Sequence, residues 1–516
     1  MNTAEQFERA ARRHPDALAV VCESGSVTYQ RLHDRSSQFA NALAAMGIEP
    51  GARVATWLEN SVACVEIDFA LAKAGLVRVP LNPRCTIREA CVILTDVEPD
   101  ALLLGAGFAE HARDLQGAAP TLRHTIVVGD AHPAALPAGA LAYEDLIARA
   151  IASHPRCPAD DETLHSIFYT SGSSGRPKGC MHTHRGIFQV ACNVLLEIGP
   201  AAPGEKLLLL QPLSHGAAYF VLPYLMRGCT VVVMPRFDAS RALTLMHDMA
   251  IETVRLVPTM LQRMLRAPEI ETLVFPKLRQ ILYAGSPVPG EVLREAIDRF
   301  GPRLCQQYGQ SEAPSTLALL ERADHTLENL ERGVLGTAGY PWPTVELKVV
   351  DRDDRALPDG TAGEVIARAP HCMAGYWKQP ELSARTLRGG WLRTNDLGVI
   401  ESDGRLRLLG RMDEMIVSGG YNIAPREVED VLHRHPAVIE AAVVAEPDPE
   451  WGQAVVAYVV VSDPALEADA LIAFARPLLG YKRPRRIHLR SELPKTPNGK
   501  IEKSALRPVA TASCGP

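Results

Sequence analysis

The sequence predicts an α/β fold, with a large N-terminal domain of mostly parallel sheets and helices, a small β subdomain, and a small α+β C-terminal domain. Three observations predict this fold. Amphipathic helical segments alternate with short apolar runs up to about residue 340. Short alternating strands rich in Gly, Asp and Pro follow, and the C-terminal residues then return to mixed helices and strands.

Two amphipathic helices are predicted near the N-terminus. Apolar residues recur at helical spacing in residues 29–46, where Gly47 ends the pattern, and again in residues 62–74. Short apolar runs follow at residues 101–104, 125–128, 207–210, 230–234, 254–257 and 281–284. Such runs are typical of strands buried in parallel sheets with helical crossovers, whose functional loops lie beyond the carboxyl ends of the strands.

The predicted β subdomain occupies residues 341–411, where short alternating segments indicate antiparallel strands. Beyond it, the pattern predicts helices at residues 425–434 and 467–479 and strands at 441–446 and 454–461. We therefore predict a large N-terminal domain, residues 1–410, and a small C-terminal domain, residues 411–516.

Charge and cysteine usage exclude several classes of protein. The net charge is −6 with no block of like charges, which argues against nucleic-acid binding. The 11 cysteines form no CxxC pair and are expected to be reduced thiols. The N-terminus lacks an export signal and no apolar run has the length of a membrane span, so we expect a cytoplasmic protein without a transmembrane segment.

Residues 166–179, SIFYTSGSSGRPKG, are typical of a phosphate-binding loop. Small residues allow an anion to approach the backbone closely, hydroxyl and N–H groups donate to phosphate oxygens, and a lysine adds charge. The spacing differs from the Walker pattern, since Pro177 stands where that pattern requires glycine. The candidate phosphate-binding residues are Thr170, Ser171, Gly172, Ser173, Ser174, Gly175 and Lys178.

Further motifs follow in a fixed order: QPLSHGA at 211–217, ILYAGSPVP at 281–289, QQYGQSE at 306–312, WLRTNDLG at 391–398, LGRMDEMIVSGGYNI at 409–423 and PKTPNGKI at 494–501. Together with the phosphate loop they resemble the signatures of the adenylate-forming superfamily, in its acyl-CoA synthetase (carboxylate–CoA ligase) branch. The resemblance spans residues 27 to 503. It implies that ATP and a carboxylic acid form an acyl-adenylate and pyrophosphate, and that a thiol then displaces AMP.

The resemblance also implies residue roles in adenylation. Lys500, Glu312 and His215 are the expected catalytic residues, with Glu312 and Thr170 as Mg²⁺ ligands. Asp396 is expected to bind the ribose, Arg411 the ribose or phosphate, and Tyr308 the adenine. The other expected nucleotide-binding residues are Gly285, Ser286, Pro287, Gln307, Gly309 and Ser311.

Two positions depart from the family pattern. Ser311 replaces the usual threonine and keeps its hydroxyl, and Asn395 replaces the usual glycine. Because asparagine tolerates positive φ, we expect the turn at Asn395 to be preserved. A nucleotide-sensing or CoA-sensing protein without catalytic activity would be expected to lose Lys500 or Glu312, and both are present.

The second half-reaction is assigned by the same resemblance. Asp413 is the expected hinge about which the small, mobile domain rotates, and Ser418, Gly419 and Gly420 are the expected CoA-binding residues. CoA is the expected acceptor, with an acyl carrier protein as the alternative.

The expected acyl pocket comprises His215, Gly216, Ala217, Ala284, Gly309 and Pro314. No carboxylate in residues 215–219 could pair with an amino group, which disfavours amino acids as substrates. A medium-chain or aromatic monocarboxylate is expected instead. The protein is expected to be a monomer or homodimer.

Overall fold

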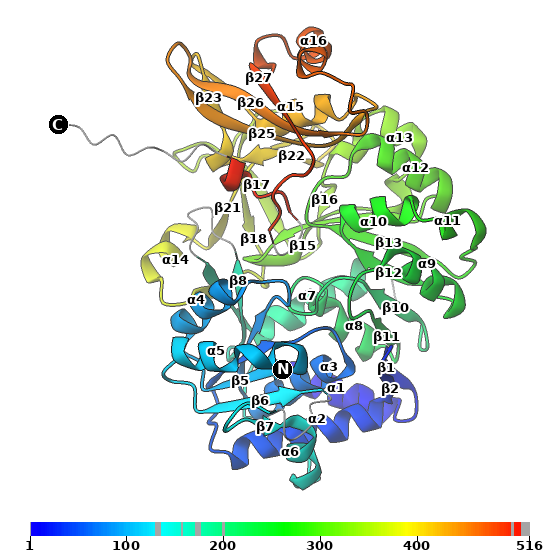
Figure 1. The fold of residues 1–516 in the computed structure, drawn as a ribbon, viewed down its shortest axis with the longest axis vertical. Helices are drawn as coiled ribbons and strands as arrows, with labels where there is room; N and C mark the ends of the chain where they lie inside the picture. The colour runs from blue at the N-terminus through cyan, green and yellow to red at the C-terminus, as the bar shows by residue number, and fades with distance from the viewer. Residues whose placement is uncertain are drawn as a thin grey trace, which may run out of the picture.

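The computed structural model describes residues 2–129, 136–155, 158–170, 177–198, 202–496 and 500–506. Within these ranges the chain forms two large mixed sheets, a smaller antiparallel sheet, and a C-terminal α+β unit at the top of the view in Figure 1. The two large sheets lie in the N-terminal part of the chain, as the sequence predicts.

The first large sheet has nine strands in the described part of the chain. Its central strands, β14, β13, β12, β10, β11 and β1, are parallel to one another. The antiparallel strands β15, β16 and β2 lie toward the two edges of the sheet. Its order is β16 (Tyr340–Pro341), β15 (Ala313–Leu320), β14 (Leu304–Gln310), β13 (Gln280–Ala284), β12 (Thr253–Leu256), β10 (Lys206–Leu209), β11 (Thr230–Val233), β1 (Leu18–Cys22) and β2 (Gly25–Thr28).

The second large sheet has eight strands among the residues described, with a parallel core and two antiparallel strands at one edge. Its order is β19 (Gly375–Tyr376), β9 (Lys178–Thr183), β8 (Leu164–Thr170), β4 (Val77–Leu81), β3 (Arg53–Trp57), β5 (Ala101–Gly105), β6 (His124–Val128) and β7 (Leu141–Ala142). The predicted apolar runs therefore all become strands of these two sheets.

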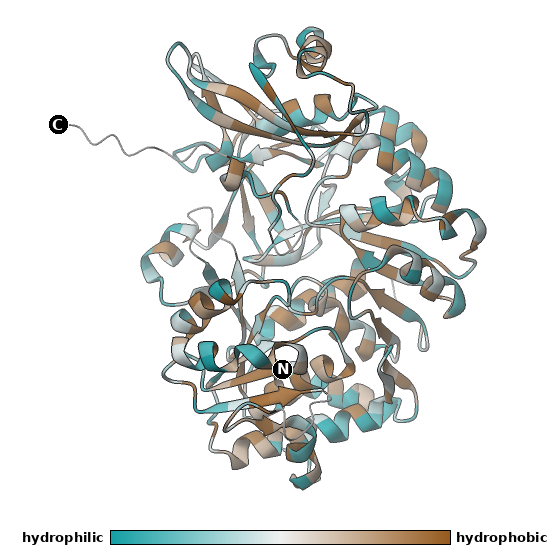
Figure 2. Cartoon of the chain, viewed as in Figure 1, coloured by the Kyte–Doolittle hydropathy of each residue, from teal (hydrophilic) through white to brown (hydrophobic). Residues whose placement is uncertain are grey.

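Helices cover both sheets and fill the space between them. The core between the sheets contains residues of α1 (Thr3–Arg13), α2 (Tyr29–Ala45), α3 (Val62–Ala74), α7 (His184–Glu197) and α8 (Val221–Met226). The outer face of the nine-stranded sheet packs on α9 (Ala239–Asp248), α10 (Pro258–Leu265), α11 (Glu269–Thr272) and α12 (Gly290–Phe300). That of the eight-stranded sheet packs on α4 (Ile87–Val97) and α5 (Ala112–Ala118). Figure 2 shows hydrophobic residues concentrated in the strands of both sheets.

Local sequence signals set the limits of the two predicted N-terminal helices. The Thr28 side chain accepts from the Arg31 N–H at the start of α2, and the Ser61 side chain caps α3 in the same way. Gly75, with φ of 68°, ends α3. Three short helices lie elsewhere: α6 (Tyr143–Arg149), α13 (Leu327–Glu331) and α14 (Pro380–Thr386).

The predicted β subdomain is an antiparallel sheet with the order β17 (Glu346–Val350), β18 (Gly363–Arg368), β21 (Trp391–Ile400) and β20 (Leu387–Arg388), with β22 (Leu406–Arg411) also paired to β21. After β22 comes the short 3₁₀ helix η6 (Met412–Glu414). The predicted boundary between residues 410 and 411 lies at this point and stays a prediction.

The C-terminal unit has its own buried core, made by residues such as Ile416, Val443 and Leu471. Its elements are β23 (Ile416–Ser418), β24 (Tyr421–Ile423), α15 (Pro425–Leu432), β25 (Val438–Asp448), β26 (Gly452–Val461), α16 (Ala468–Leu479) and β27 (Arg486–Arg490). The helices and strands predicted there are all present. None of the helices in the described part of the chain has both the length and the apolar character needed to cross a membrane.

Candidate active site

The site forms where the carboxyl ends of parallel strands meet the β14–β15 hairpin and the β21–β22 hairpin. After β13, Gly285 adopts φ of 101° and begins an exposed turn with Ser286 and Pro287. Ser311 and Glu312 form the turn between β14 and β15. Gly309 lies at a register shift in this hairpin, where a β-carbon would come within 2.5 Å of the Ser315 nitrogen, so the position requires glycine.

Asp396 is the centre of a hydrogen-bonded cluster. The Tyr308 hydroxyl donates to its Oδ2 at 2.5 Å, the Gln310 amide donates to the same oxygen at 2.8 Å, and Arg411 donates to Oδ1 at 2.8 Å. A carboxylate has about four acceptor positions, and these bonds occupy three of them. The neighbouring Asn395 has φ of 59°, so asparagine adopts the expected positive φ, but it lies within strand β21, at an irregularity in its register with β18, rather than in a turn. Gln310 is a contact that the sequence motif did not reveal.

Glu312 is held by residues from the other large sheet. The Tyr376 hydroxyl donates to Glu312 Oε1 at 2.7 Å, and burial together with the Glu312 charge raises the pKa of Tyr376, which keeps it a donor. The Lys178 ammonium lies 5.7 Å from the centroid of the same Tyr376 ring. Lys178 and Glu312, which are far apart in the sequence, are therefore brought together by Tyr376 on β19.

His182 positions the backbone of the same turn. Its Nε2 lies 2.8 Å from the Ser311 carbonyl oxygen, to which it donates. Burial lowers the pKa of His182 to about 4, so the ring is neutral at pH 7 and Nε2 carries its single proton. His184, two residues further on, instead contacts Thr3 at the start of α1 and has a structural role.

The phosphate loop is described only at its two ends. Thr170 ends β8 and pairs in register with Lys178 of β9. The predicted residues Ser171, Gly172, Ser173, Ser174 and Gly175 lie outside the described residues. Gly179 allows β19 to cross closely, because a β-carbon there would meet Ile167 at 2.7 Å and Trp377 at 3.2 Å.

Lys500 of the C-terminal unit extends into this site. A β-carbon built on Gly285 would lie 3.9 Å from Cε of Lys500. Although the residue as a whole is exposed, desolvation of its ammonium lowers the pKa of Lys500; Asp396 and Glu312 oppose this shift and Arg411 adds to it. These interactions place the ammonium within electrostatic reach of the predicted nucleotide-binding residues.

His215 lies on a loop anchored by buried polar side chains. Asn60 accepts from the Leu213 N–H at 2.7 Å and donates to the Gln211 carbonyl at 2.9 Å, and Arg78 donates to the Leu213 carbonyl at 3.0 Å. Burial lowers the pKa of His215 to about 4, and the nearby Lys500 and Arg255 charges act in the same direction. The imidazole is therefore neutral at pH 7, with one ring nitrogen that can donate a hydrogen bond and one that can accept.

The predicted acyl-pocket residues gather around the same edge of the nine-stranded sheet. Ala284 and Gln307 pair in register on β13 and β14, and Ala217 and Pro314 are buried. Arg255 of β12 also reaches this pocket, within 3.3 Å of the position of a β-carbon on Gly216. Sequence reasoning missed Arg255, because an arginine inside an apolar strand has no motif; its place in a buried run was the available signal.

The predicted CoA-binding residues form a tight hairpin in the C-terminal unit. Gly419 and Gly420 have φ of 57° and 83° and connect β23 to β24, a conformation suited to glycine. A β-carbon on Gly419 would meet the Trp451 ring at 2.5 Å. Both glycines are exposed, whereas Ser418 is buried. The predicted hinge residue Asp413 lies in η6, 4.0 Å from Arg411.

The residues present fit a magnesium site. No group of three or more His, Cys, Asp or Glu side chains in the described part of the chain could hold a metal. Mg²⁺ in nucleotide sites, however, needs only one or two protein carboxylates, because phosphates and water supply the remaining ligands. The Glu312 carboxylate and the Thr170 hydroxyl offer the hard oxygen donors that this ion prefers.

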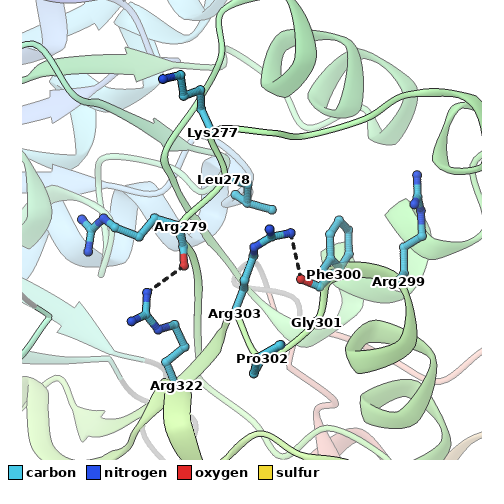
Figure 3. A pocket seen from close by; sticks show the side chains of 9 residues that line it. All are labelled: Lys277, Leu278, Arg279, Arg299, Phe300, Gly301, Pro302, Arg303 and Arg322. Carbon is cyan, nitrogen blue, oxygen red and sulfur yellow. Dashed lines mark hydrogen bonds between the residues drawn. The ribbon is translucent and has the colours of Figure 1, made fainter.

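An open hollow of about 640 Å³ lies elsewhere, at the amino ends of β13 and β14 (Figure 3). Arg322 donates to the Arg279 carbonyl at 3.2 Å, and Arg303 donates to the Phe300 carbonyl at 3.0 Å. The hollow contains none of the predicted site residues. It is lined by Lys277, Leu278, Arg279, Arg299, Phe300, Gly301, Pro302, Arg303 and Arg322.

Comparison with known proteins agrees with this geometry. The profile of the AMP-binding enzyme family matches residues 7–377, and that of the AMP-binding enzyme C-terminal domain matches residues 427–500. The chain belongs to the AMP-binding enzyme family. This confirms the resemblance to the adenylate-forming superfamily and the expectation of an enzyme.

Individual relatives cover nearly the whole chain. A feruloyl-CoA synthase of an Amycolatopsis species is 35% identical over 503 residues, which are 97% of each chain. A fatty acid–acyl-carrier-protein ligase of Streptomyces coeruleorubidus is 35% identical over 510 residues, 96% of this chain and 94% of the relative. The structure of the amide bond synthetase McbA from Marinactinospora thermotolerans superposes with a TM-score of 0.89 at 31% identity, covering 98% of this chain and 99% of that one. The predicted fold class is thereby confirmed.

Proposed function

We propose that this chain is an AMP-forming carboxylic acid–CoA ligase that uses ATP, Mg²⁺ and CoA. The carboxylate attacks the α-phosphorus of ATP to form an acyl-adenylate and releases pyrophosphate. The CoA thiol then attacks the acyl carbon, forms the thioester and releases AMP. The convergence of Lys500, Glu312 and Asp396, from three distant parts of the sequence, supports this proposal most directly.

Adenylation brings two anions together, so the site must supply fixed positive charge and hydrogen-bond donors. Lys500 places an ammonium beside the Gly285 turn, where it can contact both the substrate carboxylate and the α-phosphate. Lys178 and the phosphate loop hold the pyrophosphate that leaves. When bound, Mg²⁺ neutralises phosphate charge, and Glu312 and Thr170 are the residues that would hold it.

Asp396 binds the ribose in this proposal. Tyr308, Gln310 and Arg411 orient its carboxylate, and the remaining acceptor position suits a ribose hydroxyl. Burial and the Asp396 charge raise the pKa of Tyr308, so its hydroxyl stays a donor throughout. The Tyr308 ring is left to contact the adenine.

CoA is proposed as the acceptor because the glycine hairpin exposes backbone along which a narrow thiol arm can pass. Of two relatives at 35% identity, one is named as a CoA synthase and the other as a ligase for an acyl carrier protein. The carrier protein therefore remains the alternative acceptor. We propose a cytoplasmic location, and either a monomer or a homodimer.

Acid-dependent exchange of labelled pyrophosphate into ATP tests the first half-reaction. Lys500→Ala should abolish exchange yet still convert supplied acyl-adenylate and CoA into the thioester. The matched control is Lys495→Ala, five residues earlier in the sequence, since Lys495 pairs with Glu440 at 2.5 Å and its loss is expected to leave exchange intact. Equal loss of both half-reactions in Lys500→Ala would contradict its assigned role.

Mass spectrometry of products formed with CoA, with a phosphopantetheinylated carrier protein and with both together identifies the acceptor. Acyl-CoA should accumulate with CoA alone. If the carrier protein is acylated and no acyl-CoA forms, the acceptor is the carrier protein and not CoA.

A further inference from the structure

Arg255 is a charged residue inside the acyl pocket. It is 2% exposed and lies on β12, between the apolar neighbours Val254 and Leu256. Its guanidinium donates to Gln211 through Nη1 and to the Ser315 hydroxyl through Nη2 at 3.3 Å. The guanidinium carbon lies 4.3 Å from the centroid of the Phe220 ring.

This charge has no acidic partner among the residues that the structure describes. The described hydrogen bonds of the guanidinium go to neutral groups, Gln211 and Ser315, and its buried Nε has no hydrogen-bond partner among the described residues. Desolvation lowers the pKa of Arg255 to about 9, so it remains charged at pH 7. Arg78 provides the contrast, because this other buried arginine lies 3.2 Å from the Asp68 carboxylate.

An unpaired buried charge is costly, so its retention requires a partner from outside the folded chain or another compensating role. Gly216, a residue of the predicted acyl pocket, lies beside the guanidinium. A β-carbon on Gly216 would lie 3.3 Å from Nη2 and 3.6 Å from Nη1 of Arg255. Glycine at this position therefore keeps a side chain from packing onto the charge.

Two other polar residues lie near Arg255: Gln307 on the same face of the sheet, and Ser315 in contact with the guanidinium. In the sheet register, Arg255 pairs with Leu282 and Leu282 with Cys305, so Gln307 lies on the same face of the sheet, one pleat nearer the carboxyl ends. Gln307 is 2% exposed, and neither its Oε1 nor its Nε2 has a hydrogen-bond partner among the described residues. Ser315, which contacts Arg255, has φ of 55°, a strained conformation that often marks a binding site.

We propose that the acid activated by this enzyme carries a second carboxylate, and that Arg255 binds it at the far end of the acyl pocket. The proposal rests on the proposed function and refines the substrate class, since the sequence motifs had indicated a monocarboxylate. One carboxylate reacts near Lys500 and His215. The other pairs with the Arg255 guanidinium, and the Ser315 hydroxyl and the Gln307 amide supply further hydrogen bonds.

Matched acids test the proposal by pyrophosphate exchange. Each pair consists of a monocarboxylate and its dicarboxylate counterpart, such as hexanoate and adipate, octanoate and suberate, or benzoate and terephthalate; the monomethyl ester of each diacid is a third arm. At least one diacid should exceed both its matched monoacid and its monoester in kcat/KM by about 30-fold or more, as expected for one buried charge pair.

Three variants separate binding of a second carboxylate from a structural role. Arg255→Met should lower kcat/KM for the diacid by about this factor more than it lowers kcat/KM for the matched monoacid, and Arg255→Lys should keep the preference in part. Gly216→Ala leaves the guanidinium in place but narrows access to it, and should lower kcat/KM for the diacid more than for the monoacid. Without ATP, the preferred diacid should raise the Tm of the wild-type protein and not that of Arg255→Met.

The outcomes are distinguishable. Equal use of monoacids and diacids by the wild type, with the same ratio in Arg255→Met, would overturn the proposal and assign Arg255 a structural role in holding Gln211 and Ser315. A preference for diacids that Arg255→Met leaves unchanged would also overturn it. If no acid of any kind supports pyrophosphate exchange, that result would instead contradict the proposed function itself.

Discussion

Tyr376 offers a sharp test of how the site is assembled, because no sequence motif pointed to it. Its hydroxyl donates to Glu312 Oε1 at 2.7 Å, and its ring lies against the Lys178 ammonium. Tyr376→Phe removes the hydroxyl and retains the ring. Glu312 then loses the donor that orients it, while the fold of β19 and its contact with Lys178 are preserved.

The expected size of the effect follows from this single bond. A hydrogen bond to a charged group contributes about 1.5–3 kcal/mol. If that energy is used to orient Glu312 for nucleotide and Mg²⁺, kcat/KM for ATP in pyrophosphate exchange should fall about 10- to 150-fold. The concentration of Mg²⁺ needed for half-maximal exchange should rise as well. Initial rates over a matrix of ATP and Mg²⁺ concentrations measure both effects.

Tyr143→Phe is the matched control. It also removes a buried tyrosine hydroxyl that donates to a carboxylate, at 3.0 Å to Glu66, but on α6 rather than in the site. The two variants should lose comparable stability, and only Tyr376→Phe should lose exchange activity. Wild-type kinetics and Mg²⁺ dependence in Tyr376→Phe would refute the assignment of Tyr376 as a positioning residue for Glu312.

Three further predictions concern the turn, the glycine hairpin and stability in acid. Gly309→Ala should destabilise the protein by about 1–3 kcal/mol and impair exchange, because its β-carbon would meet the Ser315 backbone at 2.5 Å. Gly107→Ala is the control, since a β-carbon there meets nothing within 4 Å, and it should change neither stability nor exchange. Denaturant titrations measure the stability of both variants, and pyrophosphate exchange measures their activity. Gly420→Leu, at φ of 83°, should spare adenylation and slow thioester formation from supplied acyl-adenylate; equal loss of both would argue against a role in the thiol step. Six buried histidines have pKa values lowered by burial to about 3 or 4, whereas the unfolded chain binds their protons near pH 6.5. The stability that these histidines contribute is therefore fully present above pH 6.5 and is lost as the pH falls below 6.5. At pH 5 the loss is up to about 2 kcal/mol for each histidine. A Tm that does not change between pH 7 and pH 5 would contradict this prediction. These histidines are His33, His165, His182, His184, His325 and His371.

The elements of the fold were largely predictable because their signals are local. Helix α2 runs from Tyr29 to Ala45, against a predicted range of 29–46, since a capping threonine and apolar spacing define it within the segment itself. The positive φ at Asn395 was predictable for the same reason, because it is a property of one residue, but its place within strand β21 was not. The order of strands in each sheet could not be predicted, since it depends on contacts between distant segments.

The candidate site residues were predicted from motifs, whereas their hydrogen-bond partners were not. Asp396 and Tyr308 each stand in a recognisable motif, but the bond between them depends on how β14 and β21 meet. Tyr376, Asn60 and Arg78 act by supporting motif residues from other parts of the chain. Their roles arise from three-dimensional proximity, which spacing along the chain does not encode.

The sequence by itself determined the class of chemistry, because the phosphate loop and the motifs from His215 to Lys500 each preserve reactive groups in their local context. Only the tertiary structure decided which groups surround the substrate. In the sequence, Arg255 is one polar residue in the apolar run 254–257. In the structure, its charge is buried without an acidic partner among the described residues. The physical reason is that the cost of a buried charge depends on its surroundings, and those surroundings are assembled from distant parts of the chain.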